Sequence, residues 1–361
     1  MANPSLQIGN DNWAIKEDNL LGYSTAGTRF VPEPITMTRT SAGTRVNPSG
    51  LVEDVELLGG EEVTNGDFAN WTGDNPDNFQ VLNENAANYV TESSNQLRMV
   101  SDNSATIAIR PQPTSMLTVG KIYKVSVDLT FTTGSIDISG NSFNSSGTKV
   151  FYINAGATYL QIAKTSALDV LIDNVSIKEA TIDNLARVDY TDGTSSLLVE
   201  PQRTNVNTYS EDFSQSFYIK DSGVSVGNTN YVSPSGESNA TQIEVDNNNR
   251  IYANVTSDTY SSSVFIKAGT FAYFKFGGSN VDLEAGTYSG GTIESFGNGW
   301  FRITTAYTGN RPFQIQAYPD GTYSSHTTNG NYYIWGAQAE AGSYATSYIP
   351  TSGSTVTRNQ E

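Results

Sequence analysis

A strict alternation of apolar and polar residues recurs along the chain and constrains its fold most strongly. In YKVSVDLTF, residues 123–131, apolar or aromatic side chains occupy every second position. Successive side chains of a strand point to opposite faces of a sheet, so a period of two predicts a strand with one buried and one solvated face. Five further segments of this kind, each closed by turn residues, predict an all-β protein built as an antiparallel sandwich or barrel. They are IYANV (251–255), SSVFIKAG (262–269), FAYFKFGG (271–278), WFRITTAYTG (300–309) and FQIQAYPDG (313–321).

One stretch favours a helix instead. In NDNWAIKEDNLLGY, residues 10–23, Asp11 or Asn12 is a candidate N-cap and Gly22 a candidate stop. So short a helix is stable only when it packs on another element.

The strand-rich part of the chain contains an internal near-repeat. NGDFANW at 65–71 and SEDFSQSF at 210–217 each place an Asp-Phe pair at the start of a block of strands. Each block has an aromatic-led central strand and ends in an apolar strand that runs into acidic residues, at 170–179 and 332–342. Two copies of one sandwich topology explain this pattern.

Composition excludes several classes of function. The net charge of −17 disfavours a nucleic-acid partner, because the phosphate backbone is itself negative. The chain has no Cys and a single His, His326, so thiol chemistry, disulfides and histidine-pair metal sites are excluded. No apolar run is long enough for membrane insertion, and we expect no secretion signal in MANPSLQIGNDNW.

The sequence nominates no catalytic machinery. It contains no phosphate-binding loop, no strand-led GxGxxG and no GxSxG elbow. A glycosidase needs two opposed carboxylates, and no spacing among the 37 acidic residues singles out a pair. We therefore expect no enzymatic activity.

Several motifs together resemble a family of bacteriophage and prophage virion proteins of the tail-fibre, head-fibre or generic structural type. The resemblance covers residues 36–56 and about 181–358. In that family the first segment is followed closely by the second, whereas here residues 57–180 separate them and are interpreted as an inserted module. The inserted module, with NGDF at its start and DNVS near its end, is similar to jelly-roll carbohydrate-binding modules. The motifs are TRTSAGTRVNPSGLVE, ARVDYTDGTSSLLVEPQRTNVNTYSEDFS, SVFIKAG, GNGWFRI and YYIWGAQAEAGSYATSYIPTSGSTVTR.

The resemblance implies two jelly-roll-like sandwiches, the first inserted into the connecting region of the second. Residues 1–35 would attach to capsid or tail proteins, 36–60 and 181–205 would connect, 61–180 would form the carbohydrate-binding-module-like sandwich, and 206–361 the lectin-like one. It further implies a homotrimer on the virion surface that adheres to host-surface polysaccharide. Two alternatives stay open: a purely architectural virion protein and, less favoured, a polysaccharide depolymerase.

Aromatic residues that share a strand face with polar ones are candidates for glycan binding, since sugar rings stack on flat aromatic faces. Tyr273 and Lys275 share one face of their predicted strand, and Trp300 and Arg302 share a face of theirs. Trp71 and Tyr89 are the candidates of the first module. The alternative is that these side chains cover core edges or bury against a neighbouring subunit.

Two further expectations concern charged residues. The resemblance to jelly-roll modules implies a structural calcium held by Asp67 and Asp173, on the first and last strands of the inserted module, because Ca²⁺ prefers oxygen ligands. ARVDYTDGTSSLLVEPQRTN, residues 186–205, mixes extended residues with Asp-Gly and Glu-Pro breaks and is expected to run over the surface. We expect the arginines of the connecting segments to pair with carboxylates of an adjacent copy; these are Arg39, Arg45, Arg187 and Arg203.

Overall fold

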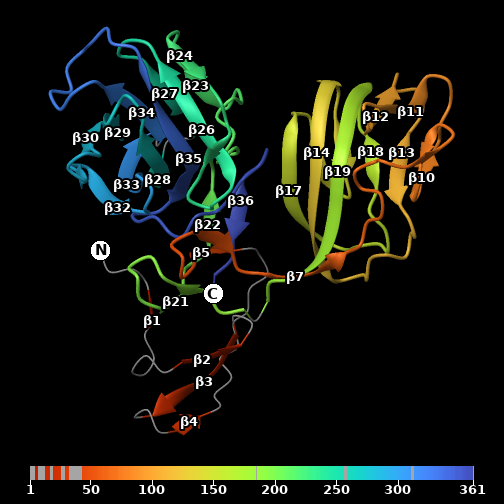
Figure 1. The fold of residues 1–361 in the computed structure, drawn as a ribbon, viewed down its shortest axis with the longest axis horizontal. Coiled ribbons are helices and arrows are strands. Elements are labelled where there is room, and N and C mark those ends of the chain that lie inside the picture. Colours follow the sequence, from red (N-terminus) through yellow and green to blue (C-terminus); the bar gives the residue numbers. More distant parts are fainter. Residues whose placement is uncertain are drawn as a thin grey trace. The chain divides into compact units, whose positions relative to one another are not determined.

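The computed structural model describes residues 43–183, 185–255, 258–309 and 313–360, and the backbone of four short strands nearer the N-terminus (Figure 1). The protein is all-β, and this described part contains no helix, hence none that could cross a membrane. The chain forms two compact units. The inserted unit is Glu56–Thr181, and the flanking unit is Met1–Val55 together with Ile182–Glu361.

The inserted unit is a sandwich of two antiparallel sheets. One sheet has the strand order β11-β12-β19-β14-β17, with β7 paired beside β19, and the other has the order β10-β13-β18-β15-β16. A small β8-β9 hairpin precedes them. The strands are β7 (Leu57–Glu61), β8 (Trp71–Thr72), β9 (Asn75–Pro76), β10 (Phe79–Leu82), β11 (Asn88–Ser93), β12 (Gln96–Ser101), β13 (Ala108–Pro111), β14 (Ile122–Thr133), β15 (Ile136–Ile138), β16 (Asn141–Phe143), β17 (Gly147–Asn154), β18 (Ile162–Lys164) and β19 (Leu168–Thr181).

The flanking unit contains a second sandwich. Its sheets have the orders β24-β26-β35-β28-β33-β32 and β23-β27-β34-β29-β30-β31, and β22 pairs with both β35 and β36. The strands are β20 (Val188–Asp189), β21 (Ser196–Leu198), β22 (Arg203–Asn205), β23 (Tyr218–Lys220), β24 (Val224–Val226), β25 (Tyr231–Val232), β26 (Ser238–Val245), β27 (Arg250–Ala253), β28 (Asp258–Ala268), β29 (Tyr273–Phe276), β30 (Ser279–Asp282), β31 (Thr287–Tyr288), β32 (Gly291–Ser295), β33 (Trp300–Gly309), β34 (Phe313–Tyr318), β35 (Gly330–Ala341) and β36 (Val356–Arg358).

The two sandwiches share one topology. Each sheet order of the inserted unit becomes that of the flanking unit when β10 to β19 are replaced in chain order, except that the flanking sheets carry β32 and β31 as additional edge strands. The matching strands are β23, β24, β26, β27, β28, β29, β30, β33, β34 and β35. The Asp-Phe pairs also match, because Phe68 and Phe213 are both fully buried in their respective cores. The structure confirms the predicted pair of jelly-roll-like sandwiches, which the internal repeat had indicated.

The alternation in the sequence places the core residues as predicted. On β14, Tyr123, Val125, Val127 and Leu129 are buried, while the residues between them are half-buried. β14 lies between β17 and β19 in the middle of its sheet. The opposing sheet of the sandwich covers its apolar face, while its polar face stays partly solvated.

The expectation that residues 186–205 run over the surface is wrong for much of this segment, because Arg187, Val188, Leu197, Leu198 and Glu200 are buried. Residues 43–55 are likewise built into the fold. The hairpin of β5 (Thr44–Val46) and β6 (Val52–Asp54) buries Val46 and Val52 in a second apolar cluster of the flanking unit. This cluster also holds Phe265 and Trp335, from strands whose other face packs into the main core. The sheet that contains β28 and β35 is therefore covered on both faces.

The helix predicted near the N-terminus is also wrong. Strands β2 (Trp13–Lys16) and β3 (Asn19–Thr25) form an antiparallel pair there, with Trp13 opposite Tyr23, and β4 (Arg29–Val31) extends it. Pairing satisfies backbone groups between segments, whereas a helix of this length is marginal by itself. The remainder of the predicted 1–35 attachment segment, apart from β1 (Ser5–Leu6), which pairs with β21, lies outside the described residues.

Candidate functional site

One outward face of the second sheet in the flanking unit combines aromatic and polar side chains. Cross-strand register places Tyr252 opposite Gln314, Lys275 opposite Gln316 and Tyr273 opposite Tyr318. We call these six residues of β27, β34 and β29 the aromatic face. The alternate residues of the same strands point into the core and are fully buried; they are Ile251, Phe274, Phe276, Phe313 and Ile315.

The tyrosines at one end of the aromatic face are held in place by their neighbours. The Lys275 ammonium lies 5.2 Å from the ring centre of Tyr318, a cation–π contact. The Tyr323 ring packs edge-on against both Tyr273 and Tyr318, at 6.1 and 5.6 Å, and its hydroxyl donates to the carbonyl of Val281. These contacts leave Tyr318 only 3% exposed, so Tyr273 presents the accessible ring at this end, in an orientation that is set before any ligand arrives.

The Tyr273 hydroxyl donates a 2.7 Å hydrogen bond to Oε2 of Glu284. This bond to a carboxylate raises the pKa of Tyr273 to about 12. Tyr273 therefore remains protonated and neutral at physiological pH, with its ring half exposed.

His326, a half-buried residue of the loop after β34, belongs to the same neighbourhood. Its Nε2 lies 2.9 Å from the carbonyl oxygen of Ala317, and its ring packs against Phe271 and Tyr318. The loop after β34 thus folds back on the sheet, and His326 helps to bury Tyr318.

The other end of the face offers hydrogen-bonding groups. Gln316 donates from Nε2 to the carbonyl of Asn248 at 2.9 Å, so its Oε1 is directed away from that bond as an acceptor. Gln314 is half-buried on the same strand two residues earlier. Arg250 is paired with Asp221 at 3.1 Å, and its guanidinium lies 5.8 Å from the ring centre of Tyr252.

Trp300 and Arg302 do not join this face, which corrects their prediction as glycan ligands. Trp300 is only 2% exposed, lies in the second apolar cluster, and donates its indole N–H to the carbonyl of Val232. Arg302 donates to the carbonyl of Thr346 at 2.6 Å. Both sit on β33 of the other sheet, whose outer face is covered by segments distant in sequence.

Trp71 and Tyr89 belong to the inserted unit, where they lie on strands of different sheets, β8 and β11. Trp71 packs partly on the core, and its indole N–H donates to the carbonyl of Phe68 at 2.7 Å. Tyr89 is half-buried on β11, opposite Val100. Neither residue is accompanied by a described stacking partner.

The predicted calcium ligands do not gather a matching set of side chains. The Gly66 carbonyl accepts from the amide of Val175, so the segments carrying Asp67 and Asp173 are neighbours as expected. Asp173, however, accepts from Gln96 and from the amide of Asn174. Within the described residues, no three acidic or histidine side chains converge on a common point. A calcium ion here would need backbone carbonyl oxygens as further ligands, and the site stays a prediction.

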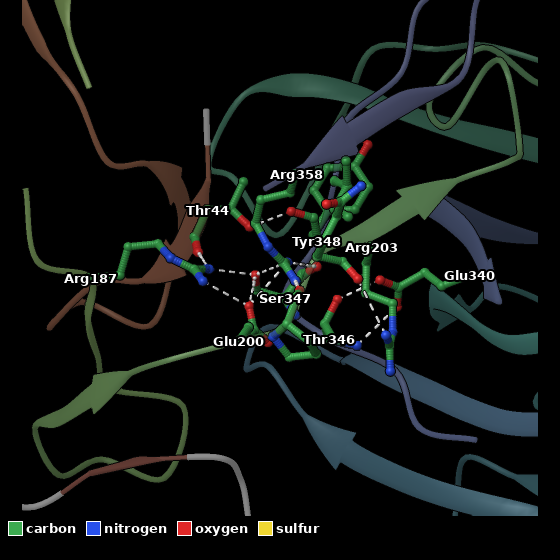
Figure 2. A network of polar contacts seen from close by, with 12 residues as sticks. Thr44, Arg187, Glu200, Arg203, Glu340, Thr346, Ser347, Tyr348 and Arg358 are labelled. Carbon is green, nitrogen blue, oxygen red and sulfur yellow. Dashed lines mark hydrogen bonds and ion pairs between the residues drawn. The ribbon is translucent and has the colours of Figure 1, made fainter. Parts of the chain in front are cut away.

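The arginines of the connecting segments make bonds inside the chain, not the predicted bonds to an adjacent copy (Figure 2). Arg187 and Glu200 are 0% and 3% exposed and lie 2.9 Å apart, and Arg45 pairs with Glu53. Arg203 stacks on Tyr344 at 5.1 Å, and Arg39 lies outside the described residues. Burial alone would raise the pKa of Glu200, but Arg358 and Arg187 outweigh it and lower that pKa. A buried charge persists only with such partners, which explains why these arginines turn inward.

Comparisons with known proteins give structural likeness only. No family model matches the chain, and no curated protein matches it. The tandem CBM22 modules of Xyn10C from Paenibacillus barcinonensis are 7% identical to this chain, with a TM-score of 0.25. The match covers 79% of this chain and 98% of the tandem modules. The tandem CBM51 modules of the family 98 glycoside hydrolase from Streptococcus pneumoniae SP3-BS71 are 9% identical, cover 85% and 97%, and give 0.21. At these scores the likeness adds nothing to the topology that the strand pairing establishes.

Of the eight residues nominated from sequence, Tyr273 and Lys275 alone are brought together with further suitable groups. The sequence analysis missed the other four residues of the aromatic face, which are Tyr252, Gln314, Gln316 and Tyr318. Their outward positions follow from the same period of two, but their adjacency across three strands required the sheet order.

Proposed function

We propose that the protein is a non-catalytic glycan-binding protein and that the aromatic face of the flanking unit is its binding surface. The observation that supports this most is the placement of the half-exposed Tyr273 and Lys275 on one outward sheet face, where Tyr318, only 3% exposed, supports them from the neighbouring strand. Tyrosine rings offer flat apolar surfaces for the C–H face of a sugar, and the ammonium and amide groups beside them bond its hydroxyls.

The dimensions of the face suit a short oligosaccharide. Adjacent strands lie about 4.8 Å apart, so β27, β34 and β29 together span roughly 10 Å across the sheet. Binding groups at both ends, Tyr252 and Tyr273, favour a chain of sugars over a single ring.

The resemblance of residues 36–56 and about 181–358 to virion proteins gives this binding a biological setting. We propose a fibre or decoration subunit on the virion surface that adheres to host polysaccharide. In a homotrimer three such faces would act together, and a second engagement gains from effective concentration without any new contact.

A purely architectural role is the second candidate, and one observation favours it. Trp300 and Arg302, one of the two aromatic–cation pairs nominated from sequence, are used inside the fold. Much of the aromatic chemistry of this chain therefore serves stability. A depolymerase is the third and least favoured reading, because no opposed carboxylate pair is part of the face.

A glycan array probed with the full chain tests the proposal, followed by calorimetric titration of the best ligand. Tyr273→Ala and Lys275→Ala are each expected to weaken binding about tenfold, or about 1.4 kcal/mol. Tyr190→Ala and Lys267→Ala are the matched controls, because they remove the same residue types away from the aromatic face. Absence of any retained glycan, or equal losses in the controls, would refute the proposal and favour the architectural role.

A further inference from the structure

The inserted unit contains a pocket that the aromatic face does not involve. Its volume is about 250 Å³, and it opens between the turn before β14, the β15-β16 turn and the loop joining β17 to β18. It is lined by Leu117, Ser139, Ile153, Asn154, Ala155, Gly156, Ala157, Tyr159 and Gln161.

The walls of this pocket are divided by polarity. Leu117, Ile153 and Ala155 are buried members of the core and form an apolar part. Asn154 and Ser139 are exposed and carry an amide and a hydroxyl. None of the lining side chains is charged at neutral pH. Such a pocket, mostly apolar with a few polar groups, is the usual form of a small-molecule site.

Backbone hydrogen bonds hold the loop around the pocket in one shape. The amide of Ala155 donates to the carbonyl of Lys121 at 2.9 Å, and the amide of Leu117 donates to the carbonyl of Thr158 at 3.0 Å. On the other side, the Gln161 amide donates to Oγ of Ser139 at 3.1 Å. A pocket fixed in this way costs little conformational entropy when it binds a ligand.

Arg110 fixes the two side chains that would contact a ligand. Its guanidinium carbon lies 4.0 Å from the ring centre of Tyr159 and covers one face of that ring. Its Nε and Nη2 donate to Oε1 of Gln161 at 2.9 and 2.5 Å. The second face of the Tyr159 ring and the amide NH₂ of Gln161 are then the groups left for a ligand, a stacking surface beside a donor.

We propose that this pocket binds a single neutral pyranose ring. A pyranose has one apolar C–H face and a periphery of hydroxyls, which complement the apolar wall with Tyr159 and the polar groups of Gln161 and Asn154 respectively. The volume is below the roughly 300–1,000 Å³ of pockets for drug-sized ligands, which limits the site to one ring. The Arg110 guanidinium is directed at the Tyr159 ring and at Gln161 and does not line the pocket, so a neutral ring needs no ion pair there.

Ligand-observed saturation-transfer NMR of the full chain with a panel of neutral methyl pyranosides tests the proposal. At least one glycoside is expected to receive saturation from the wild type and to lose at least three quarters of the signal in Tyr159→Ala. Asn154 is exposed, so Asn154→Ala should not disturb folding. This variant is expected to lower the affinity for the same glycoside at least threefold in titration. Tyr190→Ala is the matched tyrosine control and is expected to bind as the wild type does.

Tyr273→Ala separates this proposal from that of the aromatic face. If binding of the glycoside persists in Tyr273→Ala and is lost in Tyr159→Ala, the glycoside binds in the pocket. This result holds whether or not the aromatic face also binds glycans. Loss in Tyr273→Ala with no change in Tyr159→Ala and Asn154→Ala would overturn the pocket and leave the aromatic face standing. Binding of no panel member would also overturn it.

Discussion

Arg187 and Arg358 share one carboxylate oxygen: Nη2 of Arg187 and Nη1 of Arg358 lie 2.9 and 3.0 Å from Oε2 of Glu200 (Figure 2). Both guanidiniums are fully buried, and the other carboxylate oxygen accepts from the amide of Ser347 at 2.7 Å. Arg187 also donates to the carbonyl of Thr44. One buried acid thus joins the β5-β6 hairpin, the connecting segment that carries Arg187, and the C-terminal segment that carries Ser347 and Arg358.

Removing the charge of Glu200 should destabilise the protein strongly. Glu200→Gln leaves two buried guanidiniums without their counter-charge, and breaking a buried pair costs about 3–5 kcal/mol. Denaturant unfolding measures the loss. Glu237→Gln, at an exposed glutamate, is the control and should change the free energy of unfolding by less than about 0.5 kcal/mol. A loss in Glu200→Gln no larger than in the control would contradict the prediction.

The pH dependence of the free energy of unfolding should reveal the raised pKa of Glu340. Burial raises the pKa of its carboxyl, in spite of the bonds that it accepts from Thr346. The folded state then holds the proton more tightly than the unfolded state, so this group contributes stability below the ordinary pKa of about 4.5. That contribution is lost as the pH rises from there through the raised folded-state pKa.

Glu340→Gln keeps an acceptor and a donor facing Thr346 but cannot ionise. In the window above about pH 4.5, the free energy of unfolding of the wild type should fall relative to that of the variant, by at most about 1.4 kcal/mol per pH unit. Urea titrations at a series of pH values measure both slopes. Parallel slopes would show that Glu340 does not titrate in this window.

Trp300 and Tyr273 should show opposite effects. Trp300→Ala removes a buried indole and should cost about 3–5 kcal/mol of stability while leaving the glycan affinity of the folded protein unchanged. Tyr273→Ala should lower that affinity with a small cost in stability, because its ring is half exposed. Thermal unfolding and titration of both variants check the pattern. A loss of affinity in folded Trp300→Ala would argue for a site on the other sheet.

Gly66 should tolerate no side chain. A Cβ at this position would lie 2.0 Å from the carbonyl oxygen of Val175, a backbone atom that cannot move aside cheaply. Gly66→Ala should therefore push the NGDF segment away from β19 and cost about 1–3 kcal/mol. Gly60→Ala, where nothing lies within 4 Å, is the matched control. Equal stability of the two variants, measured by thermal unfolding, would show that the segments separate without cost.

The sequence by itself determined the fold class and the duplication. A period of two is a local property, so the buried positions of β14 could be predicted without knowing its neighbours. The Asp-Phe repeat likewise predicted two equivalent cores, and Phe68 and Phe213 occupy them.

Only the tertiary structure decided which outward faces stay accessible. Trp300 and Tyr273 follow the same alternation, yet Trp300 is covered by residues such as Val46 and Tyr348, hundreds of positions away from one another in sequence, while Tyr273 is not. The pocket around Tyr159 likewise depends on three segments, the turn before β14, the β15-β16 turn and the β17-β18 loop. These segments meet only after the strands have paired into sheets. Alternation fixes two faces for each strand, but contacts between distant segments determine whether the second face meets solvent or another layer, because burial is a property of the assembled sheets.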